Sequence, residues 1–528
     1  MSAVISFPNK QDEIISYNPA TTEEIGRVAN TSAEAVREAV EKSRQGFEDW
    51  KKTSFGERAK FVMRAREMIL SELDEIARLI SDESGKPVAE SLSMEIAPVL
   101  DLMQYFAKNT AKILKPERIN IGLYANLGRT SKIIYKPLGT VGIIPAWNYP
   151  FTIPLGEVVM SLMAGNAVIL KPSELTPFTG LKIGEIFEKA KLPENVLQVI
   201  TGDGRTGAAL VDAGIEKIMF TGSVATGKKI AESAAKHLTS VVLELGGKDP
   251  MIVFADANLE LAAQGAIWGA FCNSGQSCSS VERLYVEESV AKEFTDLIVE
   301  KTRKLRQDSG DKETTDGAAM SSERQLKIVE DHVESFRNEG AKILTGGNRN
   351  TNFKGTFYEP TVIAGATNEM RGMREETFGP TLPIATFKTE EEAVKLANDS
   401  DFGLTASVWT KDLKKGNRVA EKILAGTVCV NEVLYTHGIG QTPWGGFKQS
   451  GYGRTHGKQG LMELVRPQHI HVNRFLFTPN AWWMPYSSTA IETFRGFARH
   501  FATGSLRQTM KLAPQLLKRI KELRKKEK

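Results

Sequence analysis

The run Val141-Gly142-Ile143-Ile144 begins a series of short apolar segments that alternate with helical patterns in the middle of the chain. Four further segments of this kind follow, at residues 167–170, 196–200, 217–220 and 241–243. Short apolar runs separated by helices are typical of strands that are buried in a parallel sheet and joined by helical crossovers. The series therefore predicts an α/β fold built on a parallel sheet.

The regions on either side of this series extend the prediction. The first hundred residues place apolar side chains at helical spacing, as in residues 35–50, and are expected to be mostly helical. Farther along the chain, residues 283–286 and 407–410 again have the pattern of strands, so we expect a second α/β domain. Gly246-Gly247 lies between the two regions and is the expected crossover point.

Two segments near this crossover carry reactive side chains. Leu243-Glu244-Leu245-Gly246-Gly247-Lys248 offers a carboxylate, and Phe271-Cys272-Asn273-Ser274-Gly275-Gln276-Ser277-Cys278 offers a thiol. A free thiol has a pKa of about 8.5, so a cysteine nucleophile needs a neighbouring group that favours the thiolate. A glutamate within hydrogen-bond reach can act as a general base. Glycines in both segments let the backbone approach a substrate closely.

Together these segments resemble those of the aldehyde dehydrogenase superfamily, whose nucleophile segment reads Phe-x-Asn-x-Gly-Gln-x-Cys and whose base segment reads Glu-Leu-Gly-Gly-Lys. The likeness covers about residues 15–475, and further family motifs follow in the expected order. It implies an α/β protein with two Rossmann-like parallel-sheet domains, one for the cofactor and one for catalysis, and a small β hairpin for oligomerisation. It also implies the NAD(P)-dependent oxidation of an aldehyde.

The resemblance assigns the catalytic roles. Cys278 would attack the aldehyde carbon, and the Asn148 amide would stabilise the resulting oxyanion together with the backbone N–H of Cys278. Hydride transfer would leave a thioester, and Glu244 would activate the water that hydrolyses it to the free carboxylic acid. Family members that pass the acyl group to coenzyme A typically lack this glutamate. Lys248 and Glu463 match positions implicated in proton relay, with surface charge or a helix-end contact as the alternative.

Two glycine-rich turns are candidates for binding the pyrophosphate of the cofactor. Gly202-x-Gly204-x-x-Gly207 follows a predicted strand and matches the dinucleotide fingerprint, but this pattern alone is weak. In the family, the pyrophosphate lies at the later turn that matches residues 220–227, where a helix N-terminus supplies backbone donors. We therefore expect the earlier turn to lie beside the adenine end.

Two further segments complete the cofactor site that the resemblance implies. Lys171 and Glu174 would reach the hydroxyls of the adenosine ribose, which favours NAD. Lys171 and Ser173 could accommodate a 2′-phosphate, so NADP is the alternative. Glu376 would hold the nicotinamide ribose, and Phe378 would lie against the nicotinamide. The expected cofactor-binding residues are Trp147, Lys171, Ser173, Glu174, Gly202, Gly207, Thr221, Gly222, Ser223, Gly227, Glu376 and Phe378.

The resemblance also divides the chain into domains. Family members usually oligomerise through a β-hairpin, which pairs a sheet edge that would otherwise be exposed. We therefore expect a homodimer or a homotetramer. The expected divisions are an NAD(P)-binding domain at residues 1–117 and 137–246, oligomerisation strands at 118–136 and 466–474, a catalytic domain at 247–465, and a C-terminal extension at 475–528.

The composition fits a large globular enzyme in a reducing compartment. The 528 residues are 41% apolar and include three cysteines, an odd number at no disulfide or metal spacing. Cys272 and Cys429 are expected to be packing residues. No ligand cluster accompanies His437 or His456, so we assign no metal. Residues 1–10 show no secretory signal, and a cytoplasmic location is expected.

The C-terminal extension holds the excess of positive charge. Residues 503–528 carry nine Lys or Arg and two Glu, a net charge of +7, whereas the rest of the chain sums to −3. This argues against a nucleic-acid-binding body. Trp482, Trp483 and Tyr486 precede this basic part, and Pro514 is expected to interrupt its helix. The apolar stripe of this part consists of Leu506, Met510, Leu517 and Ile520.

Aromatic and basic side chains favour an anionic membrane surface, so peripheral membrane attachment is one expectation for the extension. A cap on the oligomer or a cover over the substrate entrance is the other. Membrane attachment would favour medium-chain or long-chain lipophilic aldehydes as substrates. A semialdehyde or betaine aldehyde is the alternative substrate, and a non-enzymatic, crystallin-like binder is a remote third reading, which intact Cys278, Glu244 and Asn148 oppose.

Overall fold

The computed structural model describes residues 13–525 of the chain. Residues 1–10, where we expect no secretory signal, and residues 526–528 of the basic tail lie outside this part. The chain forms two compact units. Unit 1 consists of Met1–Leu114 and Lys136–Arg466, and unit 2 consists of Lys115–Tyr135 and Pro467–Lys528.

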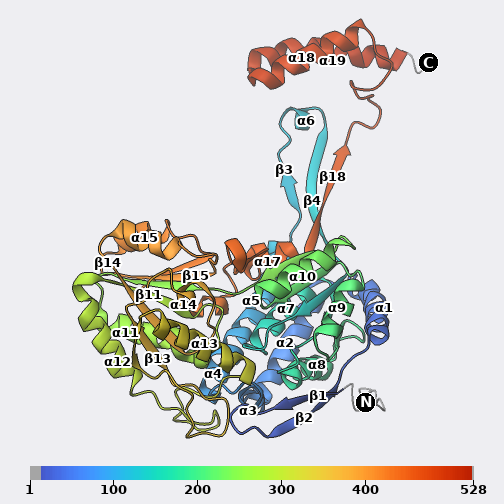
Figure 1. The fold of residues 1–528 in the computed structure, drawn as a ribbon. Coiled ribbons are helices and arrows are strands. Elements are labelled where there is room, and N and C mark those ends of the chain that lie inside the picture. Colours follow the sequence, from blue (N-terminus) through green and yellow to red (C-terminus); the bar gives the residue numbers. More distant parts are fainter. Residues whose placement is uncertain (1–12, 526–528) are drawn as a thin grey trace. The chain divides into compact units, whose positions relative to one another are not determined.

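Unit 1 contains a six-stranded sheet that confirms the predicted parallel sheet (Figure 1). The five predicted strands lie in the order β9-β8-β5-β6-β7, all parallel, and the short β17 pairs antiparallel with β9. The central strands are buried throughout, which explains their uniformly apolar sequences. The strands are β5 (Thr140–Ile144), β6 (Ala167–Leu170), β7 (Leu197–Val199), β8 (Lys217–Thr221), β9 (Ser240–Glu244) and β17 (Gly451–Tyr452), and the connecting helices are α7 (Thr152–Ala164), α8 (Pro177–Lys189), α9 (Gly204–Asp212) and α10 (Val224–Ala235).

The N-terminal hundred residues are mostly helical, as the spacing predicts, after one short β-hairpin. The start of α2 shows the local cause. The Ser54 side chain accepts from the backbone N–H of Glu57, and the Glu57 side chain accepts from that of Ser54, which forms a capping box. The elements are β1 (Glu13–Tyr17), β2 (Glu24–Ala29), α1 (Ala33–Trp50), α2 (Phe55–Ser71), α3 (Leu73–Ser84), α4 (Val88–Glu90), the π-helix η1 (Ser91–Ile96) and α5 (Ala97–Ile113).

Unit 1 also contains the predicted second α/β region, a seven-stranded sheet in the order β12-β13-β14-β11-β10-β15-β16 (Figure 1). Only β12, at one edge, is antiparallel to its neighbour. The strands are β10 (Asp249–Val253), β11 (Val281–Glu287), β12 (Lys342–Thr345), β13 (Thr361–Ala364), β14 (Thr381–Phe387), β15 (Thr405–Trp409) and β16 (Thr427–Val430). The helices are α11 (Leu259–Phe271), η2 (Cys272–Gly275), η3 (Glu288–Val290), α12 (Ala291–Thr302), α13 (Glu323–Asn338), α14 (Arg371–Arg374), α15 (Glu390–Asn398), α16 (Leu413–Ala420), η4 (Tyr435–Gly438), η5 (Lys448–Ser450) and α17 (Gly457–Glu463).

The two sheets of unit 1 meet at the predicted crossover. Strand β9 ends at Glu244 and β10 begins at Asp249, so only four residues connect them. A Cβ atom on Gly247 would lie 2.3 Å from the carbonyl oxygen of Cys278. The absence of a side chain at this position therefore allows the base segment to pack directly against the nucleophile segment.

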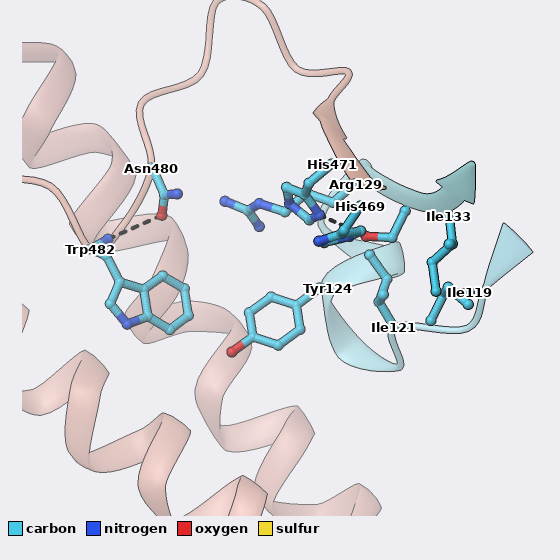
Figure 2. A pocket seen from close by; sticks show the side chains of 10 residues that line it. Ile119, Ile121, Tyr124, Arg129, Ile133, His469, His471, Asn480 and Trp482 are labelled. Carbon is cyan, nitrogen blue, oxygen red and sulfur yellow. Dashed lines mark hydrogen bonds between the residues drawn. The ribbon is translucent and has the colours of Figure 1, made fainter. Parts of the chain in front are cut away.

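Unit 2 consists of a three-stranded sheet in the order β18-β4-β3 and a pair of C-terminal helices (Figure 1). Its elements are β3 (Glu117–Ile119), α6 (Leu123–Asn126), β4 (Arg129–Pro137), β18 (Val465–Asn473), α18 (Ser488–Thr503) and α19 (Leu506–Lys525). Figure 2 shows a pocket of about 620 Å³ in this unit, with Tyr124 and Trp482 on one side and the three isoleucines Ile119, Ile121 and Ile133 on the other.

The C-terminal helices differ from the expectation in one respect. Pro514 does not interrupt the helix: α19 continues through it and packs along α18, with the buried Leu512 next to Gly496 of α18. The apolar stripe predicted for this part is largely exposed, with Leu506, Met510 and Leu517 each more than 60% accessible. Within residues 13–525, no helix is both long and apolar enough to cross a membrane.

Candidate active site

The candidate residues gather where the parallel strands of the first sheet end. Strands β5 and β8 are neighbours, yet the chain continues from β5 to β6 and β7 on one side and from β8 to β9 on the other. Ligands of open α/β sheets bind at the carboxyl ends of the strands where the order reverses in this way. The segment with Asn148 follows β5, and Thr221 and Glu244 are the last residues of β8 and β9.

The nucleophile segment adopts an unusual backbone that is held from several sides. After α11, Asn273 and Ser274 have φ values of 50° and 53°, in the left-handed region. The Asn273 side chain donates to the carbonyls of Asn148 (2.9 Å) and Gln276 (3.0 Å), and its backbone N–H donates to the Glu90 carboxylate. These bonds stabilise a conformation that costs of order 1–3 kcal/mol per residue. They fix the turn that leads to Cys278.

The thiol of Cys278 and the carboxyl group of Glu244 line one cavity. Neither carboxylate oxygen of Glu244 has a hydrogen-bond partner within the described residues. The cavity combines aliphatic, aromatic and titratable side chains from both sheets and their connecting segments. The lining residues are Ile153, Glu157, Thr221, Glu244, Leu245, Cys278, Leu404, His437, Trp444, Thr455 and His456.

Burial determines the protonation of both reactive groups. It raises the pKa of the Cys278 thiol far above its ordinary value, and the carboxylates of Asp249, Glu244 and Glu376 raise it further. Burial also raises the pKa of Glu244 well above its ordinary value, Glu157 adds to that rise, and Arg454 opposes it. The thiol therefore needs a proton acceptor before it can attack, and Glu244 has a high affinity for a proton.

Asn148 is buried and rigidly held next to the nucleophile segment. Its side-chain Nδ2 donates to the carbonyl of Gln276 at 3.2 Å, and its own carbonyl accepts from the Lys86 ammonium at 2.7 Å. Lys86 in turn pairs with the buried Glu95 at 2.6 Å. Asn148 is not among the residues that line the cavity, and within residues 13–525 its Nδ2 donates only to the Gln276 carbonyl, which leaves the second N–H of the amide available. The amide is thus fixed between β5 and the Cys278 segment.

Most residues expected at the cofactor lie at the same edge of the first sheet. Lys171, directly after β6, is buried and forms an ion pair with the half-exposed Glu174 at 3.5 Å. The Ser173 hydroxyl accepts from the backbone N–H of Leu175, which leaves the Glu174 carboxylate the more accessible group. Gly202 and Gly207 flank the start of α9, which follows the edge strand β7 and so lies away from the reversal point.

The turn between β8 and α10 lies next to the reversal point. Ser223 caps α10 by accepting from the backbone N–H of Thr226, and Gly222 donates to the carbonyl of Glu244 at 3.0 Å. The buried Thr221 hydroxyl has no partner among the described residues and lines the cavity. A helix N-terminus with a capped first turn attracts a phosphate group, so this turn fits a pyrophosphate better than the turn at Gly202.

Glu376 and Phe378 lie on the other side of the crossover. Glu376 accepts from the backbone N–H of Gly247 at 2.8 Å, and burial raises its pKa to about 8. The ring of Phe378 meets the ring of Trp147 edge to face, with centroids 5.5 Å apart. The structure therefore brings together the expected residues from both α/β regions around Gly246-Gly247.

Two expected relay residues lie elsewhere. Lys248 is fully buried in an ion pair with Glu282 at 2.5 Å, and Glu463 pairs with Lys217 at 2.6 Å. Neither residue lines the cavity of Cys278 and Glu244. Charged partners hold both side chains, and the relay role of Lys248 and Glu463 stays a prediction.

The cavity instead contains three titratable residues to which the sequence analysis gave no catalytic role: Glu157, His437 and His456. The sequence does contain a sign of Glu157, because it is the single charged residue of α7. The two imidazole rings lie 4.7 Å apart, and burial lowers the pKa of both, that of His437 to about 4. Both rings are therefore neutral.

Comparison with known proteins gives a consistent result. A sequence model described as "Aldehyde dehydrogenase family" matches residues 7–470. A 4,4'-diapolycopene aldehyde oxidase of a Methylomonas species is 39% identical over 488 residues, covering 92% of this chain and 90% of that protein. A betaine aldehyde dehydrogenase of Bacillus subtilis is 38% identical, covering 86% and 93%. A solved betaine aldehyde dehydrogenase from Staphylococcus aureus in complex with NAD+ has a TM-score of 0.85 at 33% identity, covering 90% and 94%.

Proposed function

This chain belongs to the aldehyde dehydrogenase family and oxidises an aldehyde group, and we propose that Cys278 is its nucleophile and Glu244 its general base. The observation that supports these roles best is that the thiol and the two unpaired carboxylate oxygens face one cavity. Because burial raises the pKa of the thiol, a proton acceptor must lie within reach, and the Glu244 carboxyl group is the candidate in the same cavity that has no hydrogen-bond partner among the described residues.

The geometry supports a hydrolytic mechanism. The Cys278 thiolate attacks the aldehyde carbon, and the oxyanion is stabilised by the backbone N–H of Cys278 and the Asn148 amide. A nicotinamide cofactor, when bound, supplies the hydride acceptor. Glu244 then takes a proton from water, the hydroxyl oxygen adds to the thioester carbon, and the carbon–sulfur bond breaks. The products are a free carboxylic acid and the restored thiolate.

The residues at the sheet edge fit a dinucleotide and favour NAD. The N-terminus of α10 would hold the pyrophosphate, and the accessible Glu174 carboxylate beside Lys171 would accept from a ribose hydroxyl. A 2′-phosphate at this place would be repelled by Glu174. We expect a higher kcat/KM with NAD than with NADP. Glu174→Gln should reduce the ratio of kcat/KM with NAD to kcat/KM with NADP. An unchanged ratio would contradict the role of Glu174.

The walls of the cavity support an apolar aldehyde as substrate. Ile153, Leu245, Leu404 and Trp444 form an apolar wall, and no lysine or arginine is among the lining residues. A semialdehyde with a second carboxylate would therefore find no cation to pair with. The Methylomonas relative is named for an aldehyde of 4,4'-diapolycopene. Its alignment covers 92% of this chain, so it must extend past residue 473 into the C-terminal extension.

A substrate series distinguishes the candidates. Straight-chain aldehydes from short to long, betaine aldehyde and succinic semialdehyde would be compared under the same conditions by following nicotinamide reduction. We expect kcat/KM to rise with chain length, because each buried methylene contributes about 0.8 kcal/mol. Betaine aldehyde is the second candidate, since relatives in both comparisons carry that name. If kcat/KM did not change with chain length and the activity on betaine aldehyde were high, betaine aldehyde would be favoured as the substrate.

We further propose that unit 2 attaches the enzyme to an anionic membrane surface. Eleven of the twenty-five large apolar side chains exposed in the described part of the chain lie after residue 474, among them Leu476 and Phe477, which are 82% and 90% accessible. The same segment carries the basic excess of the chain. Exposed apolar groups beside basic residues are typical of peripheral membrane contacts.

Vesicle co-sedimentation tests this attachment. The full-length protein should pellet with vesicles that contain phosphatidylglycerol and much less with pure phosphatidylcholine vesicles. Leu476→Ser combined with Phe477→Ser should reduce the pelleted fraction. Leu238→Ser is the matched control, because Leu238 is 91% exposed in unit 1. Equal pelleting of the double variant and the wild type would contradict the proposal.

The strands of unit 2 are also the proposed oligomer contact. In the three-stranded sheet, β18 and β3 are edge strands, and most side chains of β18 are exposed. An exposed edge needs a partner or protection, and a second copy of the chain would provide one. We expect light scattering on the purified protein to give the mass of a dimer or a tetramer. A monomer at micromolar concentration would contradict this.

A further inference from the structure

The cavity with Cys278 concentrates buried polar atoms that have no partner. Six such atoms belong to described residues that line it: Glu157 Oε2, Thr221 Oγ1, both carboxylate oxygens of Glu244, Thr455 Oγ1 and His456 Nδ1. Buried polar atoms almost always bond to something, water included. The space that a water-sized sphere can occupy here is about 20 Å³, which is room for roughly one water. The residues that carry these atoms therefore surround one very small space, which they share with the apolar side chains of the cavity.

Two of the five glutamates that are buried in the described part of the chain belong to this group, and they differ from the other three. Glu83 accepts from the backbone and hydroxyl of Thr179, Glu95 pairs with Lys86, and Glu282 pairs with Lys248. Glu157 and Glu244 have neither a hydrogen bond nor an ion pair within the described residues. The fold thus gives three of these glutamates hydrogen-bond or ion-pair partners and leaves Glu157 and Glu244 without one, beside the same cavity.

Among the described residues that line the cavity with the two carboxyl groups, none is a lysine or an arginine. His437 and His456 face it as neutral rings, and the Cys278 thiol is protonated at rest. Arg454 acts on Glu244 but is not among the lining residues. Two other charged groups contact the ends of α7. Glu95, which is paired with Lys86, accepts from the backbone N–H groups of Phe151 and Thr152 at one end. Arg58 donates to the Met163 carbonyl at the other end.

We propose that Glu157 and Glu244 act as one carboxyl pair that shares a single proton, and that Glu157 is the positioning residue that makes Glu244 a stronger base. This rests on the role proposed for Glu244 in hydrolysis. Two carboxylates in a small buried space repel each other, so uptake of one proton relieves both the repulsion and the burial of charge. In agreement, burial raises the pKa of Glu157 to about 8, and Glu157 raises that of Glu244.

The pair accepts the proton in the hydrolytic step. A proton of the attacking water goes to the pair, the water oxygen adds to the thioester carbon, and the electron pair of the breaking carbon–sulfur bond returns to Cys278. The carboxylic acid leaves, and the shared proton then passes to solvent. Because proton uptake relieves the repulsion, the pair is a better base than an isolated carboxylate, which lowers the barrier for water activation.

The test is the pH dependence of deacylation in Glu157→Gln, followed as single-turnover hydrolysis of the acyl-enzyme. Removal of a like charge lowers the pKa of a carboxylic acid, so Glu244 should become active at lower pH, with a shift on the order of one pH unit. The rate plateau should fall several-fold, because Glu244 is then a weaker base. Glu157→Asp should lie between Gln and the wild type. Ser161→Ala, buried on the same helix but outside the cavity, should match the wild type.

An infrared titration without aldehyde separates this inference from the proposed function. In the wild type, the carbonyl stretch of a protonated carboxyl group should still be present at neutral pH. As the pH is raised, this band should disappear at a lower pH in Glu157→Gln than in the wild type. An unchanged infrared titration and an unchanged deacylation profile would overturn the pair. The absence of a protonated carboxyl band above pH 6 in the wild type would also overturn the pair. This second outcome does not depend on whether a variant folds. An infrared shift without any effect on deacylation would support the pair and contradict the role of Glu244.

Discussion

Units 1 and 2 depart in opposite ways from the rule that apolar groups are buried and polar groups are satisfied. Unit 1 leaves polar atoms without partners inside, around Cys278, Glu157 and Glu244. Unit 2 leaves large apolar side chains outside, such as Phe477, and fully buries the guanidinium of Arg519. Each departure costs free energy. The first indicates a reaction inside the unit, and the second indicates a contact with something outside it.

The largest expected effect is that of Cys278→Ala. If the polar cavity of unit 1 is the reaction site, this variant should lose aldehyde oxidation completely, because no other described thiol lines the cavity. Cofactor binding, measured by fluorescence or calorimetry, should persist, since the thiol is absent from the sheet edge that holds Lys171 and Ser223. Cys429→Ala is the control and should keep its activity. Residual oxidation in Cys278→Ala would place the chemistry elsewhere.

Glu244→Gln should have the next largest effect. Loss of a general base typically slows its step by about 10²–10⁴-fold, so deacylation should become rate-limiting and an acyl group should accumulate on Cys278. Mass spectrometry of the quenched enzyme would detect the adduct, and a fast first turnover would precede slow steady turnover. Glu463→Gln, which affects an ion pair outside the cavity, is the comparison. An unchanged steady rate without an adduct would rule out Glu244 as the base.

The sequence predicts unit 1 well because each of its signals is local. An apolar run such as residues 141–144 marks a buried strand, and the Cys278 and Glu244 motifs follow from residue identity and order. Glu157 was missed, although it is the one charged residue of α7, because its role depends on which element faces the helix. That information is tertiary. For the same reason, the sequence could not show that Lys248 and Glu463 already have charged partners.

The sequence predicts unit 2 less well, because its helices are stabilised by packing against each other. Pro514 removes one backbone donor and favours a break, but the packing of α19 against α18, which includes the buried Leu512, outweighs it. Apolar spacing in α19 identified Leu506 and Met510 as a stripe, and in the structure these residues are exposed. Spacing shows that side chains share a face of a helix and does not show whether that face is covered.

Arg519→Met tests the buried charge of unit 2. The Arg519 guanidinium donates to the carbonyls of Ala481, Trp483 and Pro485 and pairs with Glu522, so it fastens the segment before α18 to α19. Its loss should destabilise unit 2 by about 3 kcal/mol, because several buried acceptors lose their donor. Hydrogen exchange should accelerate in α18 and α19 and remain slow in β5 and β8. Oxidation of a short aldehyde should stay within about twofold, since Arg519 is outside unit 1.

The smallest expected effect on stability is that of Leu476→Ser combined with Phe477→Ser. Exposed side chains contribute little to folding, so the free energy of unfolding should change by no more than about 0.5 kcal/mol. If the outward apolar groups of unit 2 serve a contact, the same variant should lose vesicle binding while its denaturant midpoint is unchanged. A large loss of stability would mean that these side chains are covered in the folded protein, by a second copy of the chain. In that case the variant should also lower the mass measured by light scattering, which would assign the exposed apolar groups to assembly instead of the membrane.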